Sequence, residues 1–376
     1  MSALEQRSGT QGRVALVCAG LGVVNRGYER LAQDMYDLLA PDFDVTLVRG
    51  GGPRCDGELR LRVPRRNEEP LARLGFDRAL SVELAAFAAR LLPHLARGRF
   101  DVIHYLEPYL GNVLHAARRR LRLSFTLLMT DGVGMTAASS RRADYLHVVS
   151  KRAEQQVRAG GRSDETLFSI PCGILVDRFR PTVAKNEARR LLGLPAEARI
   201  VLDVAALNRR HKRIDSLIEE VARLDDGTVF VVDGSLEDPT LLALGERLLG
   251  DRFRYLHVPT AEVPLLYTAA DVFVHGALEE GFGLAIVEAM AAGLPVVVHD
   301  QPHYRWLVGD ERQLVDLARP GSLAAALAAL PADAPERNRA RAAELDWAAL
   351  RPRYAAMYDD VLAAARPRHS NIVPAR

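Results

Sequence analysis

Short apolar runs alternate with helical patterns along most of the chain, and this alternation is the feature that most limits its fold. The first example is an apolar run at residues 14–18, a glycine-containing turn, a helical pattern at 28–39 and a second apolar run at 43–48. A strand, a tight turn, a helix and a further strand are typical of parallel sheets covered by helices on both faces. The same order returns after residue 200. The sequence therefore predicts an α/β fold with two facing, doubly wound, Rossmann-like domains and an interdomain cleft.

The predicted strands fall into two series. They are expected at residues 14–18, 43–48, 101–105, 125–129 and 145–149, and then at 200–205, 229–232, 253–258, 272–275 and 296–299. The predicted domains are residues 13–178 and 179–350, with a helix at 351–366 that packs back on the first domain and a loose tail at 367–376. Ligands of doubly wound sheets bind beyond the carboxyl ends of the strands, so the two domains predict one site in their cleft.

The composition is that of an ordinary globular protein, with 48% hydrophobic and 26% charged residues. A net charge of +2 is too balanced for a protein whose main task is to bind nucleic acid. The three cysteines, Cys18, Cys55 and Cys172, are too far apart for a disulfide framework and indicate a reducing compartment. Residues 1–12 lack the apolar core of a secretory signal, and no segment is expected to span a membrane. We therefore expect a cytoplasmic protein, with peripheral contact at the inner membrane face left open.

Residues 275–298 are the most informative segment. A strand ends at His275, a loop carries Gly281 and Gly283, and a helix is expected from about Leu284. Glycines at a helix entry let its N-terminus approach a ligand, where free N–H groups and the helix dipole favour phosphate. Glu288 lies one turn into the helix, where its carboxylate could accept both hydrogens of a ribose diol. An ordinary strand–helix crossover with a tight glycine turn would have the same spacing.

The segment Glu280-Gly281-Phe282-Gly283-Leu284, followed by Glu288-Ala289-Met290-Ala291, resembles the E-x7-E signature of glycosyltransferase family 4. That family is retaining and has the GT-B fold of two facing Rossmann-like domains. The resemblance covers roughly residues 13–360 in the family's order. It extends to Gly27-Tyr28-Glu29-Arg30, Asp101-Val102-Ile103-His104, Ala143-Asp144, Val149-Ser150, Ile170-Pro171-Cys172-Gly173 and Tyr267-Thr268-Ala269-Ala270-Asp271.

The resemblance implies a nucleotide-sugar site in the second domain. Glu280 would lie beside the donor sugar and act in catalysis, and Glu288 would bind the nucleotide ribose. The backbone N–H groups of the loop would hold the sugar or the diphosphate, and they belong to Gly281, Phe282, Gly283 and Leu284.

A basic loop, Asn208-Arg209-Arg210-His211-Lys212-Arg213, follows the first strand of the second series. Four cations at the carboxyl end of a strand suit a diphosphate, although a solvated basic loop has the same composition. The resemblance places Lys212 on the family's diphosphate-binding lysine and gives it a catalytic role. The family's arginine falls on Ala206 or Leu207, so Arg209 or Arg210 is expected to replace that charge, and Asn208 is included in the donor site.

The first domain carries a loop, Gly20-Leu21-Gly22-Val23-Val24-Asn25, that is similar to a dinucleotide fingerprint. Its third glycine is absent and no acidic residue ends the next strand, which disfavours a dehydrogenase. The family resemblance implies instead that Gly22, Asn25 and Arg26 face the donor diphosphate and the acceptor. Asp131 matches the family's T-x-H-D motif and is expected to act in catalysis, although Thr130 replaces the histidine.

The remaining polar groups are interpreted more simply. Glu107 and Tyr109 follow a predicted strand and are expected to face the cleft or to belong to a surface loop. No metal is expected, because the histidines are scattered and the D-x-D string at 42–44 precedes its strand. Two arginine clusters are predicted to be solvated faces or surfaces for anionic lipid headgroups, and they comprise Arg60, Arg62, Arg65 and Arg66, and Arg118, Arg119, Arg120 and Arg122.

These observations predict a metal-independent, retaining hexosyltransferase that uses no cofactor. The sugar would move from a nucleoside diphosphate sugar to a hydroxyl of a small metabolite, a glycan or a lipid-linked acceptor. A hydrolase with Glu280 and Glu288 as its acid–base pair is disfavoured, because such pairs lie about 5–9.5 Å apart and this spacing reaches that limit or exceeds it. A sugar-nucleotide epimerase, a phosphorylase or a non-catalytic sugar-nucleotide binder with the same fold is the alternative.

Overall fold

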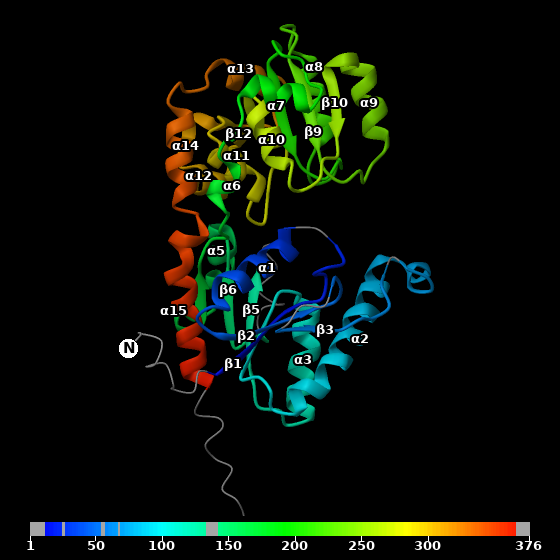
Figure 1. The fold of residues 1–376 in the computed structure, drawn as a ribbon, viewed down its shortest axis with the longest axis vertical. Helices are drawn as coiled ribbons and strands as arrows, with labels where there is room; N and C mark the ends of the chain where they lie inside the picture. The colour runs from blue at the N-terminus through cyan, green and yellow to red at the C-terminus, as the bar shows by residue number, and fades with distance from the viewer. Residues whose placement is uncertain (1–11, 25–26, 54–56, 67, 133–141, 366–376) are drawn as a thin grey trace, which may run out of the picture. The chain divides into compact units, whose positions relative to one another are not determined.

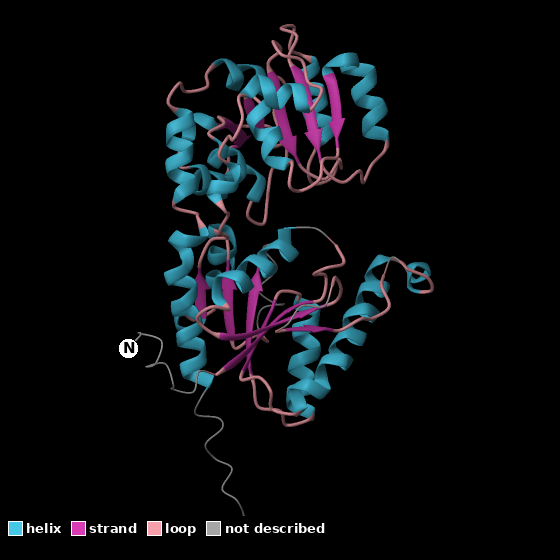
Figure 2. Ribbon diagram, in the orientation of Figure 1, coloured by secondary structure: helices cyan, strands magenta, loops and turns pink. Residues whose placement is uncertain are grey.

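The structure is a computed structural model of the 376-residue chain that describes residues 12–24, 27–53, 57–66, 68–132 and 142–365. The chain divides into two compact units, residues 1–171 with 350–376, and residues 172–349. Each unit is built on its own parallel sheet flanked by helices (Figures 1 and 2). The predicted fold class is therefore confirmed, and the division lies a few residues before the predicted joint.

The first unit contains a seven-stranded sheet in the order β3-β2-β1-β4-β5-β6-β7, with all pairs parallel. The strand order reverses between β1 and β4, as in a doubly wound sheet. The strands are β1 (Arg13–Cys18), β2 (Asp44–Arg49), β3 (Glu58–Arg60), β4 (Val102–Tyr105), β5 (Thr126–Asp131), β6 (Tyr145–Val148) and β7 (Leu167–Ser169). The helices are α1 (Gly27–Leu39), α2 (Phe76–Ala96), α3 (Pro108–Arg120), α5 (Lys151–Ala159) and most of α15 (Trp347–Ala365).

Helix α2 was not anticipated from the sequence. Its segment Asp77–Ala96 is long and apolar enough to cross a membrane by length and composition alone. A core helix of a soluble protein meets the same criterion. Leu84, Phe87 and Leu91 lie in the hydrophobic core of the first unit, so the apolar content of α2 follows from its packing.

A chain of hydrogen bonds runs through the interior of the first unit. Thr130 Oγ1 lies 2.6 Å from His104 Nε2 and 2.9 Å from His147 Nδ1. His147 Nε2 donates to the carbonyl oxygen of Ile170 at 2.9 Å, so Nδ1 of this neutral ring accepts from the Thr130 hydroxyl. His104 Nε2 must then donate to Thr130, and its Nδ1 accepts from the Tyr358 hydroxyl of α15 at 2.9 Å. Burial lowers the pKa of His104 well below its usual range and that of His147 to about 4, so both rings are neutral.

The second unit contains a six-stranded parallel sheet in the order β10-β9-β8-β11-β12-β13, which reverses between β8 and β11. The strands are β8 (Ile200–Val204), β9 (Val229–Asp233), β10 (Phe253–Leu256), β11 (Val272–Val274), β12 (Val296–His299) and β13 (Leu314–Val315). The helices are α6 (Val176–Phe179), α7 (Lys185–Leu191), α8 (Ile214–Ala222), α9 (Thr240–Leu249), α10 (Val263–Ala269), α11 (Leu284–Ala292), α12 (Pro302–Val308), α13 (Ser322–Ala328) and α14 (Ala334–Ala343).

Helix α15 carries the chain from the second unit to the first. Residues from Leu350 onward belong to the first unit, where Tyr354 Oη donates to the carbonyl of Pro171 at 3.0 Å. Arg351 forms an ion pair with Asp42. The aromatic rings of Tyr358 and Phe43 lie edge to face, with centroids 5.3 Å apart. These contacts show why the segment predicted as a helix at 351–366 is part of the first unit.

Candidate functional site

The loop between β11 and α11 forms the centre of the candidate site. Gly283 is the N-cap of α11 with a φ of +96°, a conformation that side chains disfavour. The first N–H groups of a helix have no partner within it, so the beginning of α11 offers donors to a ligand. Phe282 contributes only its backbone, because its ring is buried and packs edge to face on Trp306.

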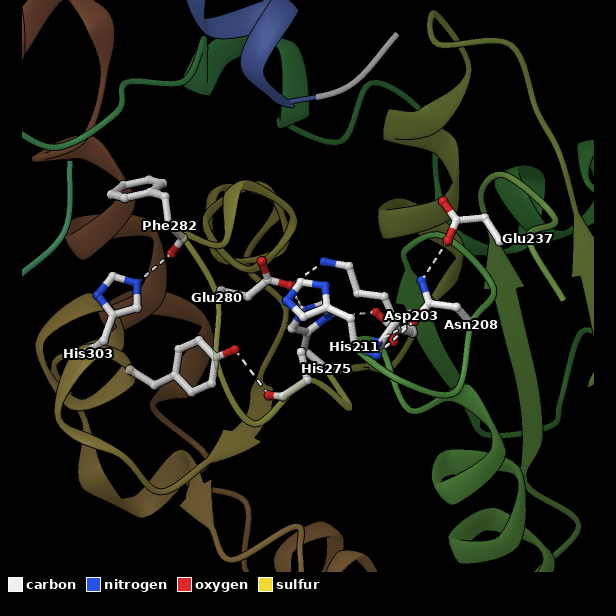
Figure 3. Close-up of polar contacts among 11 residues, drawn as sticks. Asp203, Asn208, His211, Glu237, His275, Glu280, Phe282 and His303 are labelled. Atoms are coloured by element: carbon white, nitrogen blue, oxygen red, sulfur yellow. Dashed lines mark hydrogen bonds and ion pairs between the residues drawn. The ribbon is translucent and has the colours of Figure 1, made fainter. Parts of the chain in front are cut away.

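Helix α12 fixes this loop from one side (Figure 3). His303 Nε2 donates to the carbonyl of Phe282 at 2.8 Å, and Tyr304 Oη donates to the carbonyl of Ala277 at 3.1 Å. Both side chains are buried. The loop that carries Glu280 is therefore held at two carbonyl groups.

Glu280 meets two cations in the second unit (Figure 3). Lys212 Nζ forms an ion pair with Glu280 Oε1, and His275 Nε2 lies 2.9 Å from the same oxygen. No group in the described part of the chain donates to Oε2, so this atom can accept hydrogen bonds from a ligand. Burial alone would raise the pKa of Glu280, but the hydrogen bonds and charges of His275 and Lys212 hold that pKa well below its usual range.

His275 also contacts a second carboxylate. Its Nδ1 lies 2.9 Å from Oδ1 of Asp203, and both side chains are fully buried. Burial would lower the pKa of His275, but the charge and hydrogen bond of Asp203 and the hydrogen bond of Glu280 raise it to about 9. Asp203 lies near the end of β8 and His275 directly follows β11, so the neighbouring strands bring the pair together at the point where the strand order reverses.

The basic loop after β8 places Lys212. The Asn208 carboxamide oxygen accepts from the backbone N–H groups of His211 and Lys212, each at 2.9 Å, and its nitrogen donates to Glu237 at 2.9 Å. A Cβ atom at Gly276 would lie 2.6 Å from the carbonyl oxygen of Lys212, so the close approach of the two loops requires glycine. Asn208 thus shapes the loop, a role the sequence did not indicate.

The two arginines that the sequence could not rank differ in the structure. Arg209 donates to Asp238 at 2.9 Å and to Thr240 at 3.1 Å. Arg210 is exposed, and it forms no ion pair or hydrogen bond with the described residues. Arg210 is therefore the arginine with donors available to a ligand.

Glu288 lies in α11, and its carboxylate contacts a side chain of α10. Tyr267 Oη donates to Glu288 Oε2 at 2.9 Å, and the glutamate is only 5% exposed. The whole of α11 from Ile286 to Ala292 is buried, so Glu288 is more enclosed than a position on an open helix face. Lys212 and His275 contact Glu280, whereas Tyr267 contacts Glu288, as expected for groups that contact different parts of one ligand.

Of the site residues predicted in the first unit, the structure describes only some. Gly22 has a φ of +76°, and a Cβ atom there would lie 2.4 Å from the carbonyl oxygen of Gly51. Asn25 and Arg26 lie outside the described residues. Asp131, at the end of β5, is only 1% exposed, and Thr130 points into the interior network instead of occupying a ligand site.

Glu107 is half-buried and supports the loop after β1. Its Oε1 accepts from the N–H groups of Ala19 and Gly20 at 2.7 and 3.3 Å. Burial raises its pKa to about 7. Tyr109 is exposed, so the two residues that the sequence treated together have different surroundings.

Sequence reasoning missed His275 and Asp203. A buried aspartate in an otherwise apolar strand (IVLDV) was the available signal, because such a group needs a partner. Within the described ranges, no group of three or more histidine, cysteine, aspartate or glutamate side chains could hold a metal ion. The cluster of Asp203, Lys212, His275 and Glu280 can bind an anion through Lys212 and accept hydroxyl hydrogens at Glu280.

Residues 184–346 match the family model for glycosyl transferases group 1. The lipopolysaccharide core biosynthesis mannosyltransferase LpsB of Rhizobium meliloti is 32% identical over 260 residues, which cover 62% of this chain and 72% of that protein. The D-inositol 3-phosphate glycosyltransferase of Mycolicibacterium smegmatis is 27% identical over 326 residues, which cover 77% of this chain and 75% of the relative. For other relatives, such as D-inositol 3-phosphate glycosyltransferase 2 of Catenulispora acidiphila, the match spans about half of their length.

Solved structures show the same fold. The sucrose-phosphate synthase of Thermosynechococcus elongatus has a TM-score of 0.79 at 23% identity, covering 94% of this chain and all of that chain. The HepE protein of Anabaena, in complex with UDP and glucose, has a TM-score of 0.74 at 17% identity, covering 93% of this chain and 99% of that chain. The family match, the mannosyltransferase relative and the two parallel sheets agree with the predicted resemblance. The chain therefore belongs to the group 1 glycosyl transferases, family GT4, and is a nucleotide-sugar glycosyltransferase with the GT-B fold.

Proposed function

We propose that this enzyme transfers a hexosyl group from a nucleoside diphosphate sugar to an acceptor hydroxyl, with retention of configuration and without a metal ion. The observation that supports this most strongly is the cluster of Lys212, Glu280 and His275 beside the start of α11. It combines a cation for the diphosphate with a carboxylate oxygen open to a sugar hydroxyl. The second unit would bind the donor.

The chemical demand of the reaction is stabilisation of the leaving diphosphate. As the bond to the sugar breaks, negative charge grows on the phosphate oxygen, and preorganised cations and N–H donors stabilise it. Lys212, Arg210 and the first N–H groups of α11 would supply that stabilisation. With these groups in place, a metal ion is not needed for the charge.

The acceptor is proposed at the level of a hydroxyl compound. The relatives are named for mannosyl transfer in lipopolysaccharide core synthesis and for glycosyl transfer to D-inositol 3-phosphate, so both a saccharide and a small cyclitol phosphate are reasonable acceptors. We propose that the protein works in the cytoplasm, with peripheral membrane contact if the acceptor is lipid-linked.

The proposal is tested by incubating the full-length protein with GDP-mannose or UDP-glucose and with D-inositol 3-phosphate or a core oligosaccharide, in the presence of EDTA. We expect release of nucleoside diphosphate with one donor, and an α-linked product by NMR. A β-linked product would contradict retention, and activity that EDTA abolishes would contradict metal independence. If none of the donors released its nucleoside diphosphate, the result would contradict the proposed function itself.

The two neighbouring arginines provide a prediction within this site. Replacing Arg210 with Ala should weaken binding of the matching nucleoside diphosphate about tenfold, because a charge-assisted hydrogen bond contributes about 1.5–3 kcal/mol before screening. Arg209→Ala is the matched comparison and should weaken binding less than threefold, since the Arg209 guanidinium already donates hydrogen bonds to Asp238 and Thr240. Isothermal titration calorimetry measures both constants. A larger loss in Arg209→Ala would reverse the assignment.

A further inference from the structure

A buried pair of side chains, Asp203 and His275, lies behind Glu280. The two ring nitrogens of His275 face carboxylate oxygens of Asp203 and Glu280, both at 2.9 Å (Figure 3). A carboxylate can only accept a hydrogen bond, so both ring nitrogens must donate and the ring is an imidazolium. We propose that His275, oriented by Asp203, is a positioning residue that keeps Glu280 ionised and fixed while Lys212 turns to the diphosphate of the donor. This role rests on the proposed function and adds to it a residue that directs the sugar-binding glutamate.

The charges in the cluster explain why a second cation is needed. Asp203 and Glu280 are negative, and His275 and Lys212 are positive, so the four groups balance without a ligand. A bound diphosphate brings further negative charge and attracts the ammonium group of Lys212. Like charges at short range in a partly buried site repel strongly. His275 is then the cation that remains for Glu280.

The geometry assigns different tasks to the two glutamate oxygens. Lys212 and His275 both contact Oε1, which leaves Oε2 for a ligand. Asp203 holds the imidazole ring at Nδ1, so the hydrogen bond from Nε2 fixes the direction of the Glu280 carboxylate. Loss of Lys212 from Oε1 would therefore leave the orientation of Oε2 unchanged.

The titration of His275 follows from the groups around it. Asp203, Glu280 and Lys212 interact with it directly, and Phe273 stacks on its ring with centroids 6.1 Å apart. Tyr304 from α12 donates to the carbonyl of Ala277, and burial together with Glu280, Asp203 and Glu279 raises its pKa, so it stays neutral. The balance of these groups gives the His275 pKa of about 9 stated above. Deprotonation near this pH would remove the cation beside Glu280.

The test uses two variants and one control in the full-length protein. In His275→Gln, an amide replaces the cation, and we expect kcat/KM for the active sugar nucleotide to fall about 10- to 100-fold, as when a group that orients a functional residue is lost. The loss should appear mainly in kcat, with the Kd of the free nucleoside diphosphate changed less than threefold. His257→Gln is the control, because His257 is exposed and its Nδ1 lies 3.2 Å from the carbonyl oxygen of Gly234.

Asp203→Asn keeps the shape and the hydrogen bond but removes the charge that supports the imidazolium. In the wild type, we expect kcat/KM to fall above about pH 9, and in Asp203→Asn this decline should begin at least one pH unit lower. This variant also tests the inference if His275→Gln does not fold. An unchanged pH profile in Asp203→Asn, or a wild-type kcat in folded His275→Gln, would overturn the inference. If the wild type still transferred the sugar, the proposed function would stand. A wild type that binds no donor would instead reject the proposed function.

Discussion

Replacement of Lys212 with Ala should lower kcat/KM by about 10²- to 10³-fold, the loss that follows removal of one preorganised group from a developing negative charge. Lys212 is the cation that the loop shaped by Asn208 places against Glu280. The fold should survive, because His275 still neutralises Glu280 in the variant. Steady-state release of nucleoside diphosphate measures the effect, and the thermal midpoint checks folding.

The chain offers a matched control for this substitution. Lys185, in the same unit, also forms an ion pair, with Asp271 at 2.8 Å, but it is 47% exposed. Lys185→Ala should keep its activity and should lose little stability, as is usual for an exposed pair. Near-normal turnover in Lys212→Ala would remove the lysine from the mechanism.

Replacement of Thr130 with Val should destabilise the first unit by about 2–6 kcal/mol, because two buried imidazole nitrogens each lose a partner worth about 1–3 kcal/mol. The hydroxyl donates to His147 and accepts from His104, and valine has nearly the same shape but can do neither. Differential scanning calorimetry should show a fall of roughly 5–20 °C in the midpoint of the affected unit.

Thr126→Val on the same strand is the control for this second prediction. Thr126 is also buried, at 3% exposure, but its hydroxyl makes no hydrogen bond in the described part of the chain. We expect a change of less than about 1 kcal/mol. Equal losses in the two variants would show that the Thr130 network contributes nothing beyond the packing of its strand.

The sequence predicted the features that depend on local pattern. Five strands of each sheet and the helix at 284–292 were anticipated, because apolar runs bounded by glycine are typical of buried parallel strands and of crossover helices. The short strands β3, β7 and β13 were not anticipated. The E-x7-E segment also predicted the family, which the comparisons confirm. Glu280 and Lys212, which are far apart in sequence, were assigned to one site by resemblance, and the structure places them in contact.

Features that depend on packing between distant segments could not be predicted. Nothing local to His275 shows that Asp203 faces it, because that contact arises from the pairing of β8 with β11. The difference between Arg209 and Arg210 depends on Asp238, which follows β9. Thr130 was compared with a ligand-site histidine, yet the direction of its side chain is set by His104 and His147 on the neighbouring strands.

The most direct test of the donor site is a thermal-shift comparison with UDP, GDP, ADP, CDP and dTDP. A ligand at a hundred times its Kd adds about 2.7 kcal/mol of stability, which corresponds to a shift of several degrees for a domain of this size. The account predicts that one of the five raises the midpoint of the wild type and of Lys185→Ala, and that most of this shift disappears in Lys212→Ala. A wild type that responds to none of them at millimolar concentration, or an undiminished shift in Lys212→Ala, would contradict the claim that Lys212 holds the diphosphate of a nucleotide-sugar donor.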